Sequence, residues 1–219
     1  MLSSISRRVR GFTLIELLIV IAIVGLTTAL AAPALRAFGA NAQTRTSGSS
    51  ISAALRLAQA EAVKSYQPVA FYRTAVGTCT GNEPPSPTGD YFVVRVVPNV
   101  ALTMANNAVT APATCGRLFE RSNTVTIQGP AAVCFGPNGR PVALTNATPL
   151  TGGTAPCNIP AAGQVVYWVD SSTTIPADKL KRLSIWVTLG GSIRLCDRDR
   201  VQSATAPDGC PVASVGFTT

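Results

Sequence analysis

The chain has 219 residues, with 18 basic and 10 acidic side chains and no histidine. Without histidine, a serine or cysteine nucleophile lacks its commonest base and a metal ion lacks its commonest ligand. There is no glycine-rich phosphate loop with a lysine, and the scattered acidic residues suggest no paired-carboxylate site. The sequence therefore predicts no enzyme, no metal site and no cofactor.

Residues 12–32 form a long apolar run in which Glu16 is the single charge. A helix over this run rises about 30 Å, which is enough to cross the hydrocarbon core of a bilayer. Arg7, Arg8 and Arg10 stand just before the run, and clustered basic residues keep their side of a span in the cytoplasm. The sequence thus predicts a single membrane span, with the remaining residues on the far side.

Three kinds of segment share this pattern. A cleaved secretory signal would have a shorter apolar run followed by a small-residue cleavage site. An ordinary membrane anchor explains the length and the arginines but not Glu16, because an ionisable group is costly in hydrocarbon and marks a function by default. The third kind is a processed filament subunit. The residues from Arg10 to Glu16, Arg-Gly-Phe-Thr-Leu-Ile-Glu, resemble the processing site of type IV prepilins and type II secretion pseudopilins.

This resemblance implies that residues 1–11 are a leader peptide, which prepilin peptidase, a membrane aspartic protease, removes. Cleavage would fall between Gly11 and Phe12, and the new amino group of Phe12 would then be methylated. The resemblance also assigns Glu16 to assembly, where its carboxylate pairs with the N-terminus of a neighbouring subunit. An ammonium and a carboxylate are each expensive in hydrocarbon and far less so as a pair, so a packed filament core favours this arrangement.

The helix that begins at Phe12 is expected to run to about Ser65, a length of about 80 Å. Pro33 removes one intrahelical hydrogen bond, so a bend or local melting is expected near it. After a polar stretch at 41–50, apolar residues recur at steps of three and four and predict one buried face. The residues of this face are Ile51, Ala54, Leu55, Ala58 and Ala62. The first half of the helix is assigned to membrane or filament core, and the second half is expected to lie under a sheet.

From residue 66 to 219 the chain is predicted to be one β-rich domain. Gln67-Pro68 ends the helix, and runs of β-branched and aromatic residues between loop residues predict about seven strands. They are expected at 69–74, at 91–97, in one or two pieces within 118–128, in a hairpin over 133–144, at 165–170, and in a hairpin of 183–189 with 192–196. Residues 197–219 are expected to form a polar tail. This order gives an α+β fold whose sheet is mostly antiparallel.

Six cysteines follow the membrane segment, and no two of them have the C-x-x-C spacing of a zinc or thioredoxin site. They are Cys79, Cys115, Cys134, Cys157, Cys196 and Cys210. An even number in an exported domain predicts disulfides, with 15 connectivities open, and free buried thiols are the alternative. One pair is predicted individually, Cys196 with Cys210, which closes a short loop near the C-terminus.

Three later segments resemble the FimT/GspH group of minor pilins and pseudopilins. The first is the alanine-rich helix Ala53–Tyr66, the second is the Cys134–Leu144 hairpin with its Asn-Gly turn, and the third is the closing Gly-x-x-Arg-Leu-Cys-Asp at 191–197. This resemblance implies the pilin fold, in which one long N-terminal helix packs on a mostly antiparallel sheet.

Basic residues gather near the C-terminus of the chain. Six of them fall within 22 positions: Lys179, Lys181, Arg182, Arg194, Arg198 and Arg200. FimT-like pilins are similar here, since they bind DNA through a Gly-Arg-x-Arg motif, but Ser192 replaces the first arginine in this chain. If DNA is bound, Arg194, Arg198 and Arg200 are expected to carry most of the contact, with Lys181 and Arg182 second. Asp197 and Asp199 lie between these arginines, so the alternative is a solvated, salt-bridged surface.

Three functional hypotheses follow. The first is a minor type IV pilin that assembles with other pilins in a pilus, primes it, or binds double-stranded DNA for uptake. The second is a minor pseudopilin of a type II secretion system. The third, of another class, is a membrane-anchored binding domain that does not polymerise. In each case the chain is expected to cross the bacterial inner membrane once and to place its C-terminal domain in the periplasm. After the leader is removed, the chain keeps 15 basic and 10 acidic side chains, a net charge of +5, which permits an anionic partner without requiring one.

Overall fold

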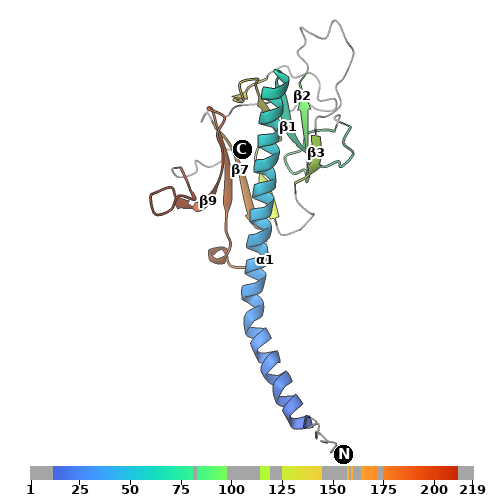
Figure 1. The fold of residues 1–219 in the computed structure, drawn as a ribbon, viewed down its shortest axis with the longest axis vertical. Helices are drawn as coiled ribbons and strands as arrows, with labels where there is room; N and C mark the ends of the chain where they lie inside the picture. Colours follow the sequence, from blue (N-terminus) through green and yellow to red (C-terminus); the bar gives the residue numbers. More distant parts are fainter. Residues whose placement is uncertain are drawn as a thin grey trace, which may run out of the picture. The chain divides into compact units, whose positions relative to one another are not determined.

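The computed structural model describes residues 12–80, 83–97, 114–118, 125–144, 157, 159, 164–171 and 175–211. The chain divides into two compact units, Met1–Gly39 and Ala40–Thr219. Figure 1 shows the helix α1, which contributes residues to both units, and the strands of the second unit.

Helix α1, Leu14–Ser65, begins two residues later than the sequence suggests, because Thr13 acts as its N-cap. The Thr13 hydroxyl accepts a hydrogen bond from the backbone N–H of Glu16 at 3.3 Å, which satisfies one of the free donors of the first turn. The helix continues without a break through Pro33, so the expected local melting is wrong. A single missing hydrogen bond does not interrupt the helix, because the flanking turns keep theirs.

In the second unit, α1 buries one face. The five apolar residues predicted for this face are at most 3% exposed, which confirms the prediction. The polar stretch before them is also partly buried, since Thr44 and Ser47 are at most 2% exposed. A Cβ atom at Gly48 would lie 3.0 Å from a side-chain carbon of Leu195. The helix therefore packs closely over the strand that carries Leu195, and small residues make this approach possible.

The strands form two five-stranded sheets. Sheet A has the order β3-β2-β1-β5-β6 and sheet B the order β10-β9-β8-β7-β4. Sheet A consists of β1 Val69–Thr74, β2 Tyr91–Val96, β3 Thr114–Arg117, β5 Ala132–Phe135 and β6 Pro141–Val142. Sheet B consists of β4 Val125–Gln128, β7 Gln164–Ser171, β8 Leu183–Thr188, β9 Ile193–Val201 and β10 Gly209–Cys210, with the short 3-10 helix η1 Ala177–Lys179 before β8. Neighbouring strands are antiparallel except β10 and β9, which are parallel.

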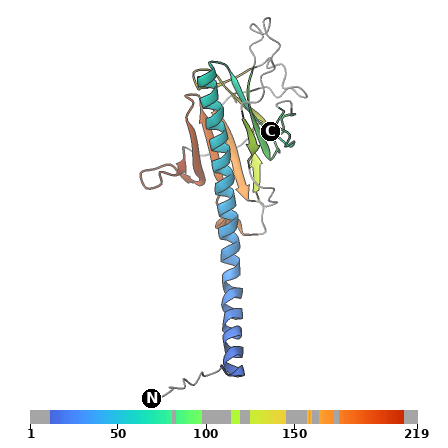
Figure 2. The ribbon, with the colours of Figure 1, turned by 45° about the vertical axis from the view of Figure 1, so that its right-hand side comes forward.

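The described residues contain ten strands, where the sequence predicted about seven. The α+β class, the first strand and both hairpins are confirmed. The region expected to hold strands within 118–128 contains β4 but not β3, which lies earlier. The prediction of a polar tail after Cys196 is wrong as far as residue 210, because β9 continues to Val201 and β10 pairs with it. In Figure 2 the segment from β9 to β10 projects to one side of sheet B.

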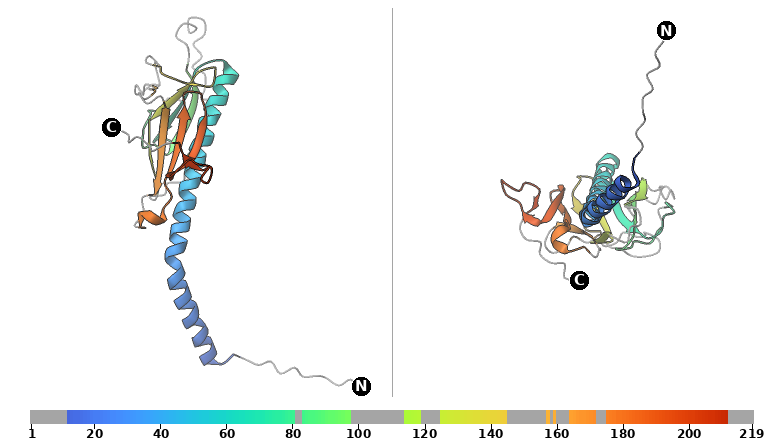
Figure 3. Two further views of the ribbon diagram at one scale, coloured as in Figure 1. Left: turned by 90° about the vertical axis from the view of Figure 1, so that its left-hand side faces the viewer. Right: turned by 90° about the horizontal axis from the view of Figure 1, so that it is seen from below.

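The main core lies between α1 and the inner faces of both sheets, as the left panel of Figure 3 shows for sheet B. Phe71 of β1 is fully buried at its centre. Its ring stacks near Phe92 of β2, with centroids 6.2 Å apart, and meets Tyr167 of β7 edge-on at 6.3 Å. Each such side chain contributes about 1.5–3 kcal/mol by burial, so this contact between the sheets is a major source of stability.

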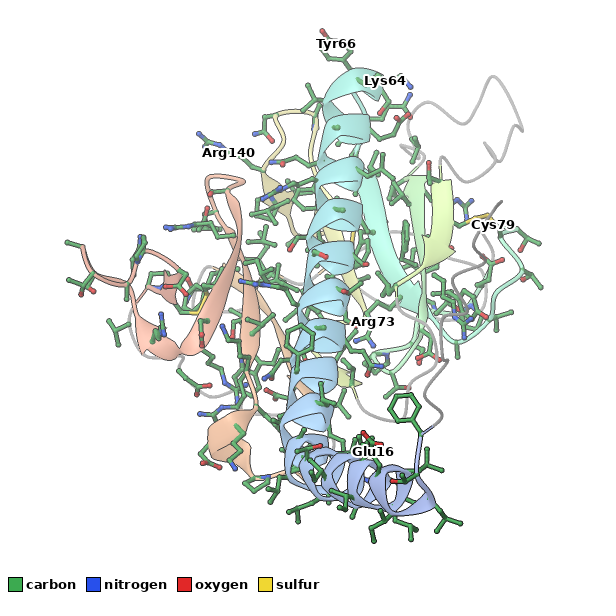
Figure 4. All side chains as sticks on the ribbon, turned by 60° about the horizontal axis from the view of Figure 1, so that its bottom comes forward. Glu16, Lys64, Tyr66, Arg73, Cys79 and Arg140 are labelled. Carbon is green, nitrogen blue, oxygen red and sulfur yellow. A yellow bond between two sulfur atoms is a disulfide. The ribbon has the colours of Figure 1, made fainter. Side chains whose placement is uncertain are left out.

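A buried cation also joins the two sheets. Arg73 of β1 is 1% exposed, and Figure 4 shows it beside α1. Its Nε and Nη2 donate to the Gly89 carbonyl at 3.1 and 3.0 Å, and its Nη1 donates to the Ile127 carbonyl of β4 at 3.2 Å. Burial lowers the pKa of Arg73, but an arginine starts so high that it stays charged. The guanidinium therefore links sheet A to the edge strand of sheet B.

One helix side chain holds the turns of two hairpins. Gln59 Nε2 donates at 2.7 Å to the carbonyl of Gly139, in the β5–β6 turn, and at 2.7 Å to that of Gly191, in the β8–β9 turn. Both glycines have positive φ, 71° and 86°. A Cβ at Gly191 would lie 2.4 Å from the Gly139 carbonyl oxygen, so glycine is required there.

All six cysteines are paired, so the alternative of free thiols is wrong. The disulfides join Cys79 to Cys115, Cys134 to Cys157, and Cys196 to Cys210, with Cα atoms 5.9, 5.5 and 5.0 Å apart. The last pair is the one predicted individually, and it ties β10 to β9. The other two fix the loop before β2 to β3 and tie β5 to residue 157.

Candidate assembly segment and basic hairpin surface

The part of α1 in the first unit exposes large apolar side chains on all sides. Phe12 is 85% exposed, and the leucines, isoleucines and valines from Leu14 to Leu35 are each about half exposed or more. An apolar surface of this size is not stable in water and requires lipid or protein around it. Among the described residues, α1 is the one helix long and apolar enough to cross a membrane.

Glu16 lies in the first turn of this helix, where a carboxylate is favoured by the helix dipole. With Thr13 it forms the Ser/Thr-x-x-Glu pattern of a capping box, and the Thr13 half of that box is made. This pattern is visible in the sequence at 13–16, but Thr13 was not predicted as the N-cap. Gly11 lies outside the described residues, so the processing site stays a prediction.

The basic residues predicted to contact DNA lie on or beside β9, and three of them are paired with carboxylates. Arg182 pairs with Asp199, and this hydrogen bond raises the pKa of Arg182. Arg200 pairs with Asp208 at 3.5 Å, with both side chains about half exposed. Such exposed pairs contribute about 0–1 kcal/mol. They do, however, cancel part of the local positive charge.

Arg198 is more buried than Arg182 and Arg200 and has two partners on β7. Its guanidinium lies 4.8 Å from the centre of the Trp168 ring and 3.4 Å from the Asp170 carboxylate, both on β7. Its side chain is 16% exposed. A partly desolvated cation–π contact stabilises by about 1–2 kcal/mol. Arg198 therefore serves to pack sheet B, and sequence reasoning missed Trp168 and Asp170 as its partners.

The other two residues predicted to contact DNA are Arg194 and Lys181. Arg194, opposite Trp186 in the β8–β9 register, donates to the neutral Gln202 side chain at 3.2 Å. The backbone of Lys181 donates to Asn41 of α1 at 2.7 Å. Within the part of the chain that the structure describes, neither side chain has a carboxylate partner. A cavity of about 80 Å³ beside Lys181 is lined by two basic side chains, Arg45 and Lys181, and two acidic ones, Asp197 and Asp208, so its lining has no excess of positive charge. The structure therefore divides the five predicted contact residues into three that are paired with carboxylates and two that have no carboxylate partner within the described ranges.

Family models match two parts of the chain. Residues 6–32 match the model described as the prokaryotic N-terminal methylation motif. Residues 47–171, more than half of the chain, match the model described as type II transport protein GspH.

The chain belongs to the GspH family.

Members of this family are type IV pilins or pseudopilins, so the resemblance seen in the sequence is confirmed. The GspH match begins within α1 and ends with β7. The β8–β9 hairpin, Arg194 and the Cys196–Cys210 disulfide lie beyond it, so the family match gives no support for a role of these residues.

Two solved structures are similar to this GspH-family chain. Both are crystal structures of the type IV minor pilin FimU of Pseudomonas aeruginosa strain PAO1, in two crystal forms, and each is 15% identical in sequence. They cover 80% and 76% of this chain and 99% of their own, with TM-scores of 0.44 and 0.42. No curated protein matches the chain significantly. Among the described residues there is no group of three or more side chains that could hold a metal ion.

Proposed function

We propose that this protein is a minor type IV pilin that is processed by prepilin peptidase and then assembles into or primes a pilus. The observation that carries the proposal is the presence of a methylation motif and a GspH domain in one chain, with α1 contributing to both. The exposed apolar side chains of Leu14–Gly39 support it, because they need lipid before assembly and other subunits after it.

Processing is proposed between Gly11 and Phe12, followed by methylation of Phe12. In the membrane the apolar segment spans the inner membrane once and the GspH domain lies in the periplasm. In the filament, Glu16 accepts the charged N-terminus of a neighbour, since the pair is less costly in hydrocarbon than its separate halves.

Mass spectrometry of the protein from its native host tests processing. The N-terminal peptide is expected to begin at Phe12 and to carry one methyl group. An intact Met1 start, or a cut after residue 30, would contradict the pilin assignment. An intact Met1 start would favour the hypothesis of an anchored domain that does not polymerise, whereas a cut after residue 30 would remove the membrane span itself.

A minor pseudopilin of type II secretion is the second candidate, and the description of the matching family model favours it. Deletion of the gene distinguishes the two. A pilin is expected to be needed for surface pili while secretion of exoproteins continues. The reverse result would assign the chain to secretion.

DNA binding for uptake is a further part of the first hypothesis. Arg194 supports it, because this exposed guanidinium has no carboxylate partner among the described residues. The ion pairs of Arg182, Arg198 and Arg200 oppose it, so binding is expected to be weak and strongly salt-dependent. Fluorescence anisotropy with double-stranded DNA and the full chain in detergent tests this. Asp199→Asn should tighten binding, because it frees Arg182. Absence of binding at low salt would leave only the structural role.

A further inference from the structure

The three disulfides differ in how far solvent can reach them. Cys134, Cys157, Cys196 and Cys210 are each at most 5% exposed. Cys79 is exposed and Cys115 is half-buried, and Figure 4 shows Cys79 at the edge of sheet A beyond β3. Thiol–disulfide exchange requires a thiolate to touch one of the two sulfur atoms, so accessibility decides which bond can react in the folded protein.

A groove of about 230 Å³ lies at the exposed disulfide. Cys79 and Cys115 form part of its wall, and the side chains of Tyr91 and Arg117 form another part. This volume is large enough for the sulfur and neighbouring atoms of an incoming thiol. Neither of the other two disulfides is as accessible, because their cysteines are buried.

The surroundings favour the leaving thiolate. Arg117 is exposed and follows Cys115 by two residues on β3, so both side chains point to the same face of the strand. Its guanidinium lies 5.6 Å from the centre of the Tyr91 ring, which holds it beside the groove. A nearby cation stabilises a thiolate relative to a thiol, and it also attracts an anionic attacking thiol.

The backbone conformation at Cys79 also favours exchange at this disulfide. Its φ of 46° is in the left-handed region, which is unfavourable for a residue with a Cβ atom. Breaking the cross-link to Cys115 would leave the loop free to adopt a commoner backbone conformation at this residue. Exposed or strained disulfides are the ones that undergo exchange most readily.

We propose that Cys79–Cys115 is an exchangeable disulfide that reacts with thiolates in the exported compartment, while the other two disulfides are purely structural. A thiolate attacks the Cys79 sulfur, forming a mixed disulfide and releasing the Cys115 thiolate beside Arg117. A second thiolate attacks the partner sulfur of the mixed disulfide. The products are one external disulfide and two cysteine thiolates, so two external thiols supply the two electrons. The reverse sequence closes the bond.

Exchange at this site would act locally. The bond joins the loop before β2 to β3, a four-residue edge strand whose pairing within the described ranges is with β2. The loop keeps a second fastening, because buried Glu83 accepts hydrogen bonds from the hydroxyls of Thr78 and Thr80. The main core between α1 and the sheets contains neither cysteine. Opening the bond is therefore expected to free β3 and leave the rest of the domain folded.

Differential alkylation of the full chain in detergent tests the proposal. The folded protein is incubated with reduced glutathione, new thiols are blocked with one reagent, and the remaining disulfides are reduced and blocked with another before peptide mapping. Cys79 and Cys115 are expected to be labelled first, at least about tenfold faster than the other four. Equal rates for all six, or earlier labelling of another pair, would overturn the proposal.

Two variants separate local exchange from unfolding. In the double variant Cys79→Ser/Cys115→Ser, the other four cysteines should stay unlabelled under the same conditions. Their rapid labelling would show that the cross-link holds the whole domain together. Arg117→Gln should slow the reaction with glutathione, which is anionic, more than with neutral 2-mercaptoethanol. Unchanged rates with both reagents would contradict the role of Arg117, whereas equal slowing of both would show that Arg117 acts on the leaving Cys115 thiolate alone.

The same experiment identifies the kind of thiol that reacts. Reduction by glutathione shows that a small thiol can enter the groove. Reduction only by a protein with a C-x-x-C dithiol indicates a thiol oxidoreductase as the partner. Both results support an exchangeable bond, and failure with both reagents would overturn it. None of these outcomes depends on whether the chain assembles into a pilus.

Discussion

The two stretches of α1 differ in what covers their apolar side chains. From Leu14 to Gly39 the side chains are large, apolar and exposed, and from Ala40 to Ser65 small and apolar side chains pack on two sheets. The second stretch obtains its partner within the same chain, whereas the first must obtain it from lipid or from other subunits. One helix therefore serves both a fold and an assembly, and substitutions in its two stretches should have separable effects.

The largest expected effect is on the second stretch. Leu55 is fully buried in the main core, so Leu55→Ala should lower the free energy of unfolding of the domain by about 2–5 kcal/mol. Leu26→Ala is the matched control, because Leu26 is 66% exposed, and it should leave the domain as stable as before. Denaturant unfolding in detergent, followed by the fluorescence of the two tryptophans, measures both. Equal losses would mean that the two stretches are not separable.

Glu16→Ala, in the first stretch, should impair assembly and leave the stability of the domain unchanged, the reverse of what is expected for Leu55→Ala. Domain stability and membrane insertion should be unchanged, while incorporation into filaments falls, because an unpaired N-terminal ammonium in the membrane costs about 2.5–3.5 kcal/mol. Quantitative immunoblotting of sheared filaments measures incorporation. Glu61→Ala, which removes only an i,i+3 pair with Lys64 on the second stretch, is the control and should assemble normally. Normal assembly of the Glu16→Ala variant would contradict the proposed pairing.

Two glycines on α1 offer a finer comparison. A Cβ at Gly48 would press on Leu195, whereas nothing lies within 4 Å of a Cβ at Gly39. Gly48→Val should therefore destabilise the domain by about 1–3 kcal/mol through overpacking. Gly39→Val should have little effect on unfolding. Thermal unfolding of the two variants measures the difference, and equal stability would contradict the close packing of α1 against β9.

The smallest effect concerns pH. Burial alone would raise the pKa of Glu83, but hydrogen bonds from Thr80 and Thr78 outweigh it and lower the pKa to about 2. A carboxylate with a lowered pKa stabilises the fold fully above its ordinary pKa of about 4.5, and this contribution is lost as pH falls towards 2. Melting temperature should therefore decline between pH 4.5 and 2, and less so in Glu83→Gln. The helicity of the first stretch in micelles should not follow this decline.

The sequence predicted the elements that local patterns specify. The face of Ile51, Leu55 and Ala58 repeats at helical steps, and the hairpin turns carry glycines at the positions that need positive φ. The pilin assignment depended on the local motif at 10–16, which is why it could be read without a structure.

Most of the failures have a common cause in contacts between residues far apart in the chain. The end of β9 looks polar, yet Arg198 is satisfied by Trp168 and Asp170, about thirty residues earlier. The partners of Cys79 and Cys134 likewise depend on how the sheets fold. The expectation at Pro33 was a bend or local melting; the melting is wrong for a separate, local reason, because one lost hydrogen bond does not interrupt the helix. The processing site at Gly11 and Phe12 stays a prediction.

The Gln59 side chain has a practical consequence for labelling this protein. Because one amide group fastens both the Gly139 and the Gly191 turns, an epitope inserted into either turn would loosen the other as well. The loop from Gln202 to Asp208 is different, since its side chains are largely exposed and the Cys196–Cys210 bond closes its base. A short tag placed there should be carried on the surface without disturbing the sheets, which makes this loop the preferred site for imaging the subunit in living cells.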